Sequence, residues 1–188
     1  MPSTPAPAHP EDPYDLDFTS LVEGPAEPPA PPPSPEIEED GLIGVNALGE
    51  EGFHVVLVRP RPGSPSNHVV MIVDDDAPTA ELAAHVLRKA GYQAVVALGP
   101  RDAARLMSRV GAPELLLLDV EMPEMNGLDF LRRIRRHKRL FDTPVVLFTA
   151  HANKGDIVRG LQAGADGYIA KPISAAALVT AVRTVLGH

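Results

Sequence analysis

The fold of this chain is decided by the stretch Leu115-Leu116-Leu117-Leu118-Asp119-Val120-Glu121-Met122-Pro123. Its first four residues are apolar without alternation, so a strand formed here would bury side chains on both of its faces. Such a strand is typical of a parallel sheet that helices cover on each side. The acid that follows, Asp119, would stand at the carboxyl end of the strand, where ligands collect in open α/β sheets.

Four further short apolar runs predict four more buried strands: Val69–Val73, Ala94–Leu98, Val145–Phe148 and Tyr168–Ala170. The segments between and after them repeat Leu, Val and Ile at steps of three and four residues, as amphipathic helices do. These segments are Glu81–Arg88, Ala103–Val110, Leu128–His137, Ile157–Ala163 and Ala175–Leu186. Strict alternation with right-handed crossovers predicts an α/β fold, a doubly wound five-stranded parallel sheet of (βα)5 type, over residues 67–188.

The first third of the chain has a different composition. Residues 1–66 hold 12 acidic residues against two arginines, together with 15 of the 21 prolines, whereas residues 67–188 hold 13 acidic and 15 basic residues. Because like charges repel and proline lacks an amide donor, we expect an acidic, Pro-rich and disordered extension over residues 1–40. Residues 41–58 are interpreted as a solvated linker with an apolar patch, with short strands or docking as the alternative, and residues 59–65 are also interpreted as a linker.

Composition also narrows the class of protein. The chain has no cysteine, which excludes disulfides and thiolate metal sites. It has neither a signal-peptide pattern nor a run of about 20 apolar residues, so we expect a cytoplasmic protein without a membrane segment. The net charge of −8 argues against nucleic-acid binding. The basic run Arg132–Arg139 is interpreted as a solvated helix face, with Leu131 and Ile134 turned to the sheet.

Polar residues follow the predicted strands. Asp74 and Asp75 come after the first strand, Asp119 after the third, Thr149 after the fourth and Lys171 after the fifth. If the first and third strands are neighbours, three carboxylates converge, and their repulsion predicts a divalent cation. Oxygen ligands of this kind favour Mg²⁺.

A carboxylate can attack phosphorus when fixed charge neutralises the phosphoryl oxygens. Asp119 is the candidate nucleophile and Lys171 the candidate cation. Thr149 offers a hydroxyl that can donate to a phosphoryl oxygen. The sequence therefore predicts an acyl phosphate site at this edge of the sheet.

Four motifs together resemble the receiver domain of two-component response regulators, of the chemotaxis-regulator kind. They are Val73-Asp74-Asp75-Asp76, Leu118-Asp119-Val120-Glu121-Met122-Pro123, Phe148-Thr149-Ala150 and Gly167-Tyr168-Ile169-Ala170-Lys171-Pro172. The resemblance implies the flavodoxin-like strand order 2-1-3-4-5. It divides the chain into an extension with its linker, residues 1–66, and a receiver domain, residues 67–188.

The resemblance also assigns roles to the site residues. Asp119 becomes the phosphoacceptor, and Mg²⁺ is held by Asp74, Asp75, Asp119 and the backbone carbonyl of Glu121. Thr149 and Tyr168 become switch residues beside Lys171, and the Lys171–Pro172 bond is expected to be cis. The implied partner is a histidine kinase or phosphotransfer protein, with a homodimer through the face of the fourth helix, fifth strand and fifth helix.

The expected function is a phosphorylation-dependent signalling switch that acts through protein contacts. The chain ends at His188 just after the last predicted helix, so no DNA-binding output domain is expected. No enzymatic activity is expected beyond self-dephosphorylation, whose rate the acid at Glu121 leaves open. One alternative is a Pro-rich interaction module gated by the receiver. An Mg²⁺-dependent phosphatase of the haloacid-dehalogenase kind fits poorly, because those enzymes carry Asp where Glu121 stands.

Overall fold

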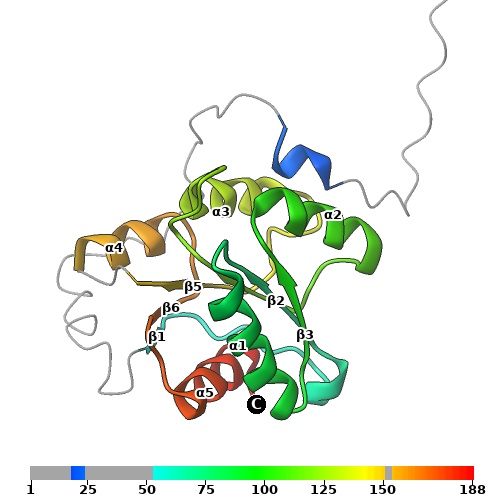
Figure 1. The fold of residues 1–188 in the computed structure, drawn as a ribbon, viewed down its shortest axis with the longest axis vertical. Coiled ribbons are helices and arrows are strands. Elements are labelled where there is room, and N and C mark those ends of the chain that lie inside the picture. Colours follow the sequence, from blue (N-terminus) through cyan, green and yellow to red (C-terminus); the bar gives the residue numbers. More distant parts are fainter. Residues whose placement is uncertain (1–17, 24–52, 151–153) are drawn as a thin grey trace, which may run out of the picture.

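The computed structural model describes residues 18–23, 53–150 and 154–188, which form a sheet between two layers of helices (Figure 1). The strands are β1 (Phe53–Val55), β2 (Val69–Val73), β3 (Gln93–Ala97), β4 (Leu115–Leu118), β5 (Val145–Thr149) and β6 (Gly167–Ala170). The helices are α1 (Ala77–Lys89), α2 (Pro100–Val110), α3 (Gly127–Arg136), α4 (Lys154–Gln162) and α5 (Ala175–Leu186). Two 3₁₀ turns, η1 (Thr19–Leu21) and η3 (Pro65–Asn67), complete the described elements.

The strand order is β1-β6-β5-β4-β2-β3. The five strands β2 to β6 are parallel and follow the predicted order, so the predicted doubly wound fold is confirmed. The sheet has one strand more than expected, because β1 pairs antiparallel with the outer edge of β6, with Phe53 opposite Ile169. The apolar run that contains β1 was interpreted as part of a solvated linker, with a short strand or docking as the alternative, and its residues Phe53–Val55 form a strand paired with β6.

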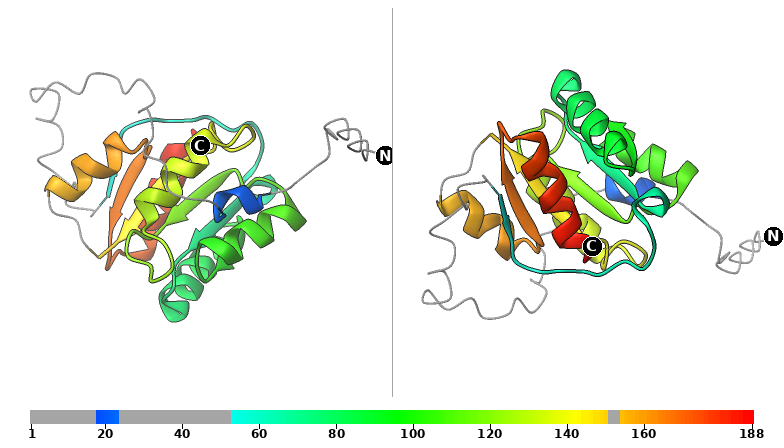
Figure 2. Two further views of the ribbon diagram at one scale, coloured as in Figure 1. Left: turned by 90° about the horizontal axis from the view of Figure 1, so that it is seen from above. Right: turned by 90° about the horizontal axis from the view of Figure 1, so that it is seen from below.

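Each face of the sheet has its own core. Helices α2, α3 and α4 cover one face, and α1 and α5 cover the other (Figures 1 and 2). Successive residues of β4 alternate between them: Leu116 and Leu118 belong to the first core, Leu115 and Leu117 to the second. All four leucines are fully buried. The unbroken apolar run in the sequence is therefore the mark of a strand covered on both sides.

Residues 18–23 lie against the outer surface of α2 and α3 (Figure 2). Phe18 and Leu21 are buried and belong to the core formed with these helices. These residues are an exception within the segment expected to be disordered, and the rest of residues 1–40 lies outside the described part of the chain. Residues 18–23 of the extension therefore contact the domain.

The interpretation of residues 59–65 as a linker misses specific bonds. The amides of Arg59 and Arg61 donate to the carbonyls of Val185 and Leu186, at 2.8 and 3.0 Å. Carbonyls in the last turn of a helix have no partner within the helix, so this segment closes the end of α5. Within the described ranges, no helix is both long and apolar enough to span a bilayer.

Candidate functional site

The predicted site residues meet at the carboxyl edge of the sheet because hydrogen bonding continues past the strand ends. The Asp119 amide donates to the Val73 carbonyl at 2.8 Å, which sets Asp119 beside the end of β2. On the other side, the Lys171 amide donates to the Thr149 carbonyl at 2.9 Å. The parallel ladder therefore brings together residues that lie up to 97 positions apart in the sequence.

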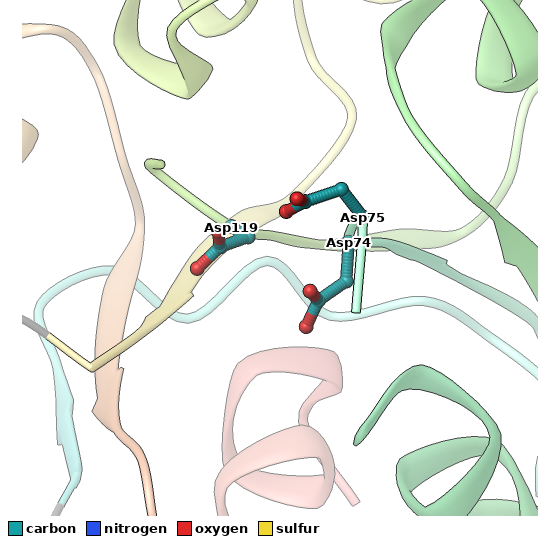
Figure 3. A group of neighbouring side chains, drawn as sticks. All are labelled: Asp74, Asp75 and Asp119. Carbon is teal, nitrogen blue, oxygen red and sulfur yellow. The ribbon is translucent and has the colours of Figure 1, made fainter. Parts of the chain in front are cut away.

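Three carboxylates converge as predicted. Asp74, Asp75 and Asp119 each offer an oxygen within 4.8 Å of the others, and their side chains face a common space (Figure 3). Asp74 and Asp119 are only 1% and 6% exposed, whereas Asp75 is exposed. Asp76 serves another purpose, because its carboxylate caps α1 by accepting from the Thr79 amide at 3.3 Å. The third acid of the run is thus a helix cap.

Lys171 supplies the positive charge of the site. Its Nζ lies 2.6 Å from Oδ2 of Asp74 and 3.1 Å from Oδ1 of Asp119. The ammonium also stands 4.8 Å from the centre of the Phe148 ring, within the range of a cation–π contact. The Lys171–Pro172 peptide bond is cis, as the resemblance implies.

The environment of Asp119 acts on its proton affinity in opposite directions. Burial raises the pKa of the Asp119 carboxyl above its ordinary value, and the negative charge of Asp74 adds to the rise. Lys171 opposes both through its charge and its hydrogen bond. Because burial has the largest effect, the surroundings favour the neutral form of the Asp119 carboxyl. A further positive charge nearby would stabilise its ionised form.

The donor set fits Mg²⁺. All three converging side chains are carboxylates, and this hard cation prefers oxygen ligands. Some oxygens already have partners: Oδ1 of Asp74 accepts from the Asp76 amide at 3.0 Å, and Oδ2 of Asp119 accepts from the Glu121 amide at 3.1 Å. The other oxygens, Oδ2 of Asp74 and Oδ1 of Asp119, contact Nζ of Lys171, so an ion held together with Asp75 would share these carboxylates with Lys171. A role for the Glu121 carbonyl stays a prediction.

The two expected switch residues stand on the neighbouring strands. Thr149 is the last residue of β5 and is buried at 1% exposure. Tyr168 lies in β6 and is buried in the core under α4, with Ile157 and Leu161. Burial raises the pKa of the Tyr168 phenol, and the negative charges of Asp156 and Asp119 raise it further, so the phenol keeps its proton. The switching roles stay predictions.

Gly127 was not among the predicted site residues, although the site depends on it. A Cβ at this first residue of α3 would lie 2.0 Å from the Asp119 carbonyl oxygen and 2.9 Å from the Val120 Cα. The Gly127 amide donates to the Val120 carbonyl at 2.8 Å, closing the loop that starts at Asp119. A glycine directly after the helix cap Asn126 is the sequence signal that could have revealed this close approach.

The basic run on α3 is only partly a solvated face. Leu131 and Ile134 are fully buried as expected. Arg135, however, is buried and pairs with Asp166 at 2.7 Å, while donating to the carbonyls of Gly164 and Thr143. The expectation of a solvated face was wrong at this position, because the partner Asp166 comes from a distant loop that periodicity cannot locate.

Comparison with known proteins gives a family for this architecture and site. The family described as the response regulator receiver domain matches residues 70–183, more than half of the chain. The chain belongs to the response regulator receiver family. The matched range contains the four strand-end motifs, so the resemblance drawn from them is confirmed. A receiver domain is a signalling module.

Two relatives are regulators by name. The chain is 37% identical to the phosphate regulon transcriptional regulatory protein PhoB of Pseudomonas aeruginosa over 118 residues, covering 62% of this chain and 51% of PhoB. It is 40% identical to the DNA-binding response regulator MtrA of Mycolicibacterium paratuberculosis over 117 residues, covering 62% and 50%. The chain spans about half the length of the curated relatives it matches.

Solved receiver structures share the fold. The chemotaxis protein CheY4 of Vibrio cholerae superposes with a TM-score of 0.60 at 27% identity, covering 63% of this chain and 98% of CheY4. The receiver domain of a histidine kinase from Syntrophus aciditrophicus gives 0.58 at 35% identity, covering 64% and 90%. The structural similarity therefore covers almost the whole of each of these receivers.

Proposed function

We propose that this receiver domain accepts a phosphoryl group on Asp119 from a phosphorylated histidine kinase or phosphotransfer protein. The observation that carries the proposal is the convergence of Asp74, Asp75 and Asp119 within 4.8 Å, with Lys171 paired to two of them. Asp119 follows the central strand β4, and its carboxylate faces the space that it shares with Asp74 and Asp75.

In the proposed transfer, a carboxylate oxygen of Asp119 forms a bond to phosphorus as the bond between phosphorus and the donor imidazole nitrogen breaks. The electron pair of that bond returns to the imidazole, which takes up a proton. Lys171 stabilises the added negative charge because its ammonium already contacts Asp119. Thr149 is proposed to donate its hydroxyl to a phosphoryl oxygen. Bound Mg²⁺ would supply the remaining positive charge.

The test is phosphoryl labelling of the full chain by acetyl phosphate with Mg²⁺, measured as a mass increase of the intact protein. Asp119→Asn should abolish labelling. Asp76→Asn is the matched control, because Asp76 belongs to the same acidic run but caps α1, and its labelling should persist. Undiminished labelling of Asp119→Asn would reject the assignment of the phosphoacceptor.

We propose that signalling proceeds through contacts with other proteins, and that the protein acts in the cytoplasm. The proposed homodimer would use α4, β6 and α5. Because β1 pairs along the outer edge of β6 and packs on α5, such a dimer has to include β1 or displace it. Full-chain mass by light scattering, with and without beryllofluoride, tests the dimer: a mass that stays monomeric would reject it.

A second candidate function makes the acidic extension an interaction module that the receiver holds. The specific observation that favours it is the contact of residues 18–23 with α2 and α3. Deleting residues 1–52 and comparing partner capture with the full chain tests this version, and unchanged capture would reject it. Self-dephosphorylation is proposed as the one chemical activity besides transfer, to be measured as loss of the added mass over time.

A further inference from the structure

The segment Phe18–Glu23 has the geometry of a bound peptide. The Leu21 amide donates to the Phe18 carbonyl at 3.1 Å, which closes one 3₁₀ turn. In such a turn, side chains three residues apart project on the same side. Phe18 and Leu21 are accordingly buried at 0% and 1% exposure, whereas Ser20 between them is exposed. One side of the segment faces the domain and the other faces solvent.

The receiving surface is formed by α2 and α3. The Phe18 ring lies 5.0 Å from the ring of His137, at the end of α3, with their planes tilted by 36°. Both buried side chains of η1 join the core cluster that contains the inward residues of the two helices. These are Ala103, Ala104 and Met107 of α2 with Phe130, Leu131 and Ile134 of α3. The contact is therefore continuous with the domain core.

A basic side chain fixes the end of the segment. Arg133 of α3 donates from one guanidinium nitrogen to the carbonyls of Leu21 and Glu23, at 3.4 and 3.3 Å. Both acceptors are backbone carbonyls, so Arg133 could bind any segment of the same backbone conformation, whatever its side chains. The apolar side chains at the first and fourth positions supply the selectivity.

The segment and its receiving surface come from separate parts of the chain. The receiver family match begins at residue 70, and residues 24–52 separate the segment from β1. The burial of two large side chains and the ordering of six residues are of comparable size and opposite sign. Such a balance makes docking reversible, in contrast to the packing of α2 and α3 on the sheet.

We infer that the outer face of the α2–α3 pair is a docking groove for a short Phe-x-x-Leu segment, and that Phe18–Glu23 of the same chain occupies it. The inference rests on the packing and hydrogen bonds of this segment and is independent of phosphoryl transfer at Asp119. A partner protein that presents the same pattern must compete with the chain's own segment.

The test uses a fluorescent peptide of residues 12–24 and the full-length protein. Phe18→Ala combined with Leu21→Ala in the protein vacates the groove, so the peptide should bind this variant at least tenfold more tightly than it binds the wild type. Fluorescence anisotropy measures both affinities. Equal affinities, or no binding to the vacated variant, would overturn the inference.

Three controls separate the groove from other effects. Ser20→Ala, at the exposed position of the same turn, should leave peptide binding as weak as in the wild type. A peptide in which Phe18 and Leu21 are both alanine should not bind the vacated variant. Arg133→Ala added to that variant should weaken peptide binding three- to tenfold. The opposite result in any of these overturns the groove assignment.

Separate measurements test whether residues 18–23 of the same chain occupy the groove and whether the vacated variant is still folded. Because the chain has no cysteine, Ser20→Cys carries a spin label at one position, and its spectrum should be immobilised; a freely mobile label would overturn docking. A wild-type dimer that the double substitution converts to a monomer would make a second copy the occupant and overturn the assignment to the same chain. Phosphoryl labelling of the vacated variant should persist, so the two proposals fail separately.

Discussion

At the scale of single residues, Asp119 carries an electrostatic conflict. Burial and the nearby charge of Asp74 raise its pKa, while Lys171 lowers it by a smaller amount. Between the ordinary pKa of an aspartate, about 3.9, and the higher folded value, the folded chain binds the proton more tightly than the unfolded chain does. The stabilisation from this carboxyl is therefore present at low pH and is lost as the pH rises through the folded pKa.

The substitution Asp119→Asn removes this conflict. Without Mg²⁺ at pH 7, we expect it to raise the free energy of unfolding by about 1 kcal/mol, because a neutral amide replaces a buried charge. Urea unfolding from pH 3 to pH 8 should show the gain disappearing toward low pH, where Asp119 is protonated. Asp129→Asn is the control: this half-buried acid pairs with Arg132 on α3, and its loss should change stability by less than about 0.5 kcal/mol. A variant less stable than wild type at pH 7 would contradict the expectation.

At the scale of elements, the sequence predicts strands most accurately where both faces of the strand are buried. Val69–Val73 and Leu115–Leu118 were expected with the bounds that the structure has, because strands buried on both faces leave unbroken apolar runs. The site followed from the same rule, since the residue after each strand must lie at the carboxyl edge. Which polar group pairs with which, such as Lys171 with Asp74, needed the folded distances.

The elements added by the extension were harder to predict. β1 is three residues long and exists through its pairing with β6, so local propensity says little about it. η1 lies in an acidic segment rich in proline, where a few apolar residues near Phe18 and Leu21 give no clear periodicity. Arg59 was assigned to a linker because several prolines follow it, yet its side chain bonds Asp166 at 2.6 Å and Asp142 at 2.5 Å. In all three cases, β1, η1 and Arg59, contacts with residues distant in the sequence determine the structure.

The contacts of Arg59 allow a prediction of how much the segment after β1 contributes to the free energy of unfolding. Asp166 is 2% exposed and receives both Arg59 and the buried Arg135, whose pKa burial lowers. Asp166→Ala leaves two guanidinium groups without this partner and should cost about 3–5 kcal/mol. Arg59→Ala leaves Asp166 paired with Arg135 and should cost about 1–2 kcal/mol.

Equilibrium unfolding in urea measures both variants. Arg105→Ala is the control, because Arg105 pairs with Asp102 at an exposed surface of α2 and should contribute less than about 0.5 kcal/mol. An Arg59→Ala variant as unstable as Asp166→Ala would mean that the segment after β1, rather than the buried Arg135 pair, holds this end of the sheet.

At the scale of the whole molecule, the carboxylate site couples ion binding to folding. Asp74 and Asp119 lie 45 positions apart, on strands that meet only in the folded sheet, so the unfolded chain has no comparable site. A ligand that binds only the folded state stabilises it in proportion to the logarithm of its concentration. At ten times its dissociation constant, Mg²⁺ should add about 1.4 kcal/mol.

Thermal unfolding with increasing Mg²⁺ checks this coupling, and the midpoint should rise by about 4 °C at that concentration, since a domain of this size gains a few degrees per kcal/mol. Chelation should reverse the rise. Asp75→Asn should abolish it, because the exposed Asp75 contributes an oxygen to the cluster without supporting the core. Asp76→Asn should keep the rise, because Asp76 lies outside the cluster and asparagine caps a helix about as well as aspartate does. An equal rise in Asp75→Asn would place the ion elsewhere on the protein, since a site built from these three carboxylates cannot lose one of them without losing affinity.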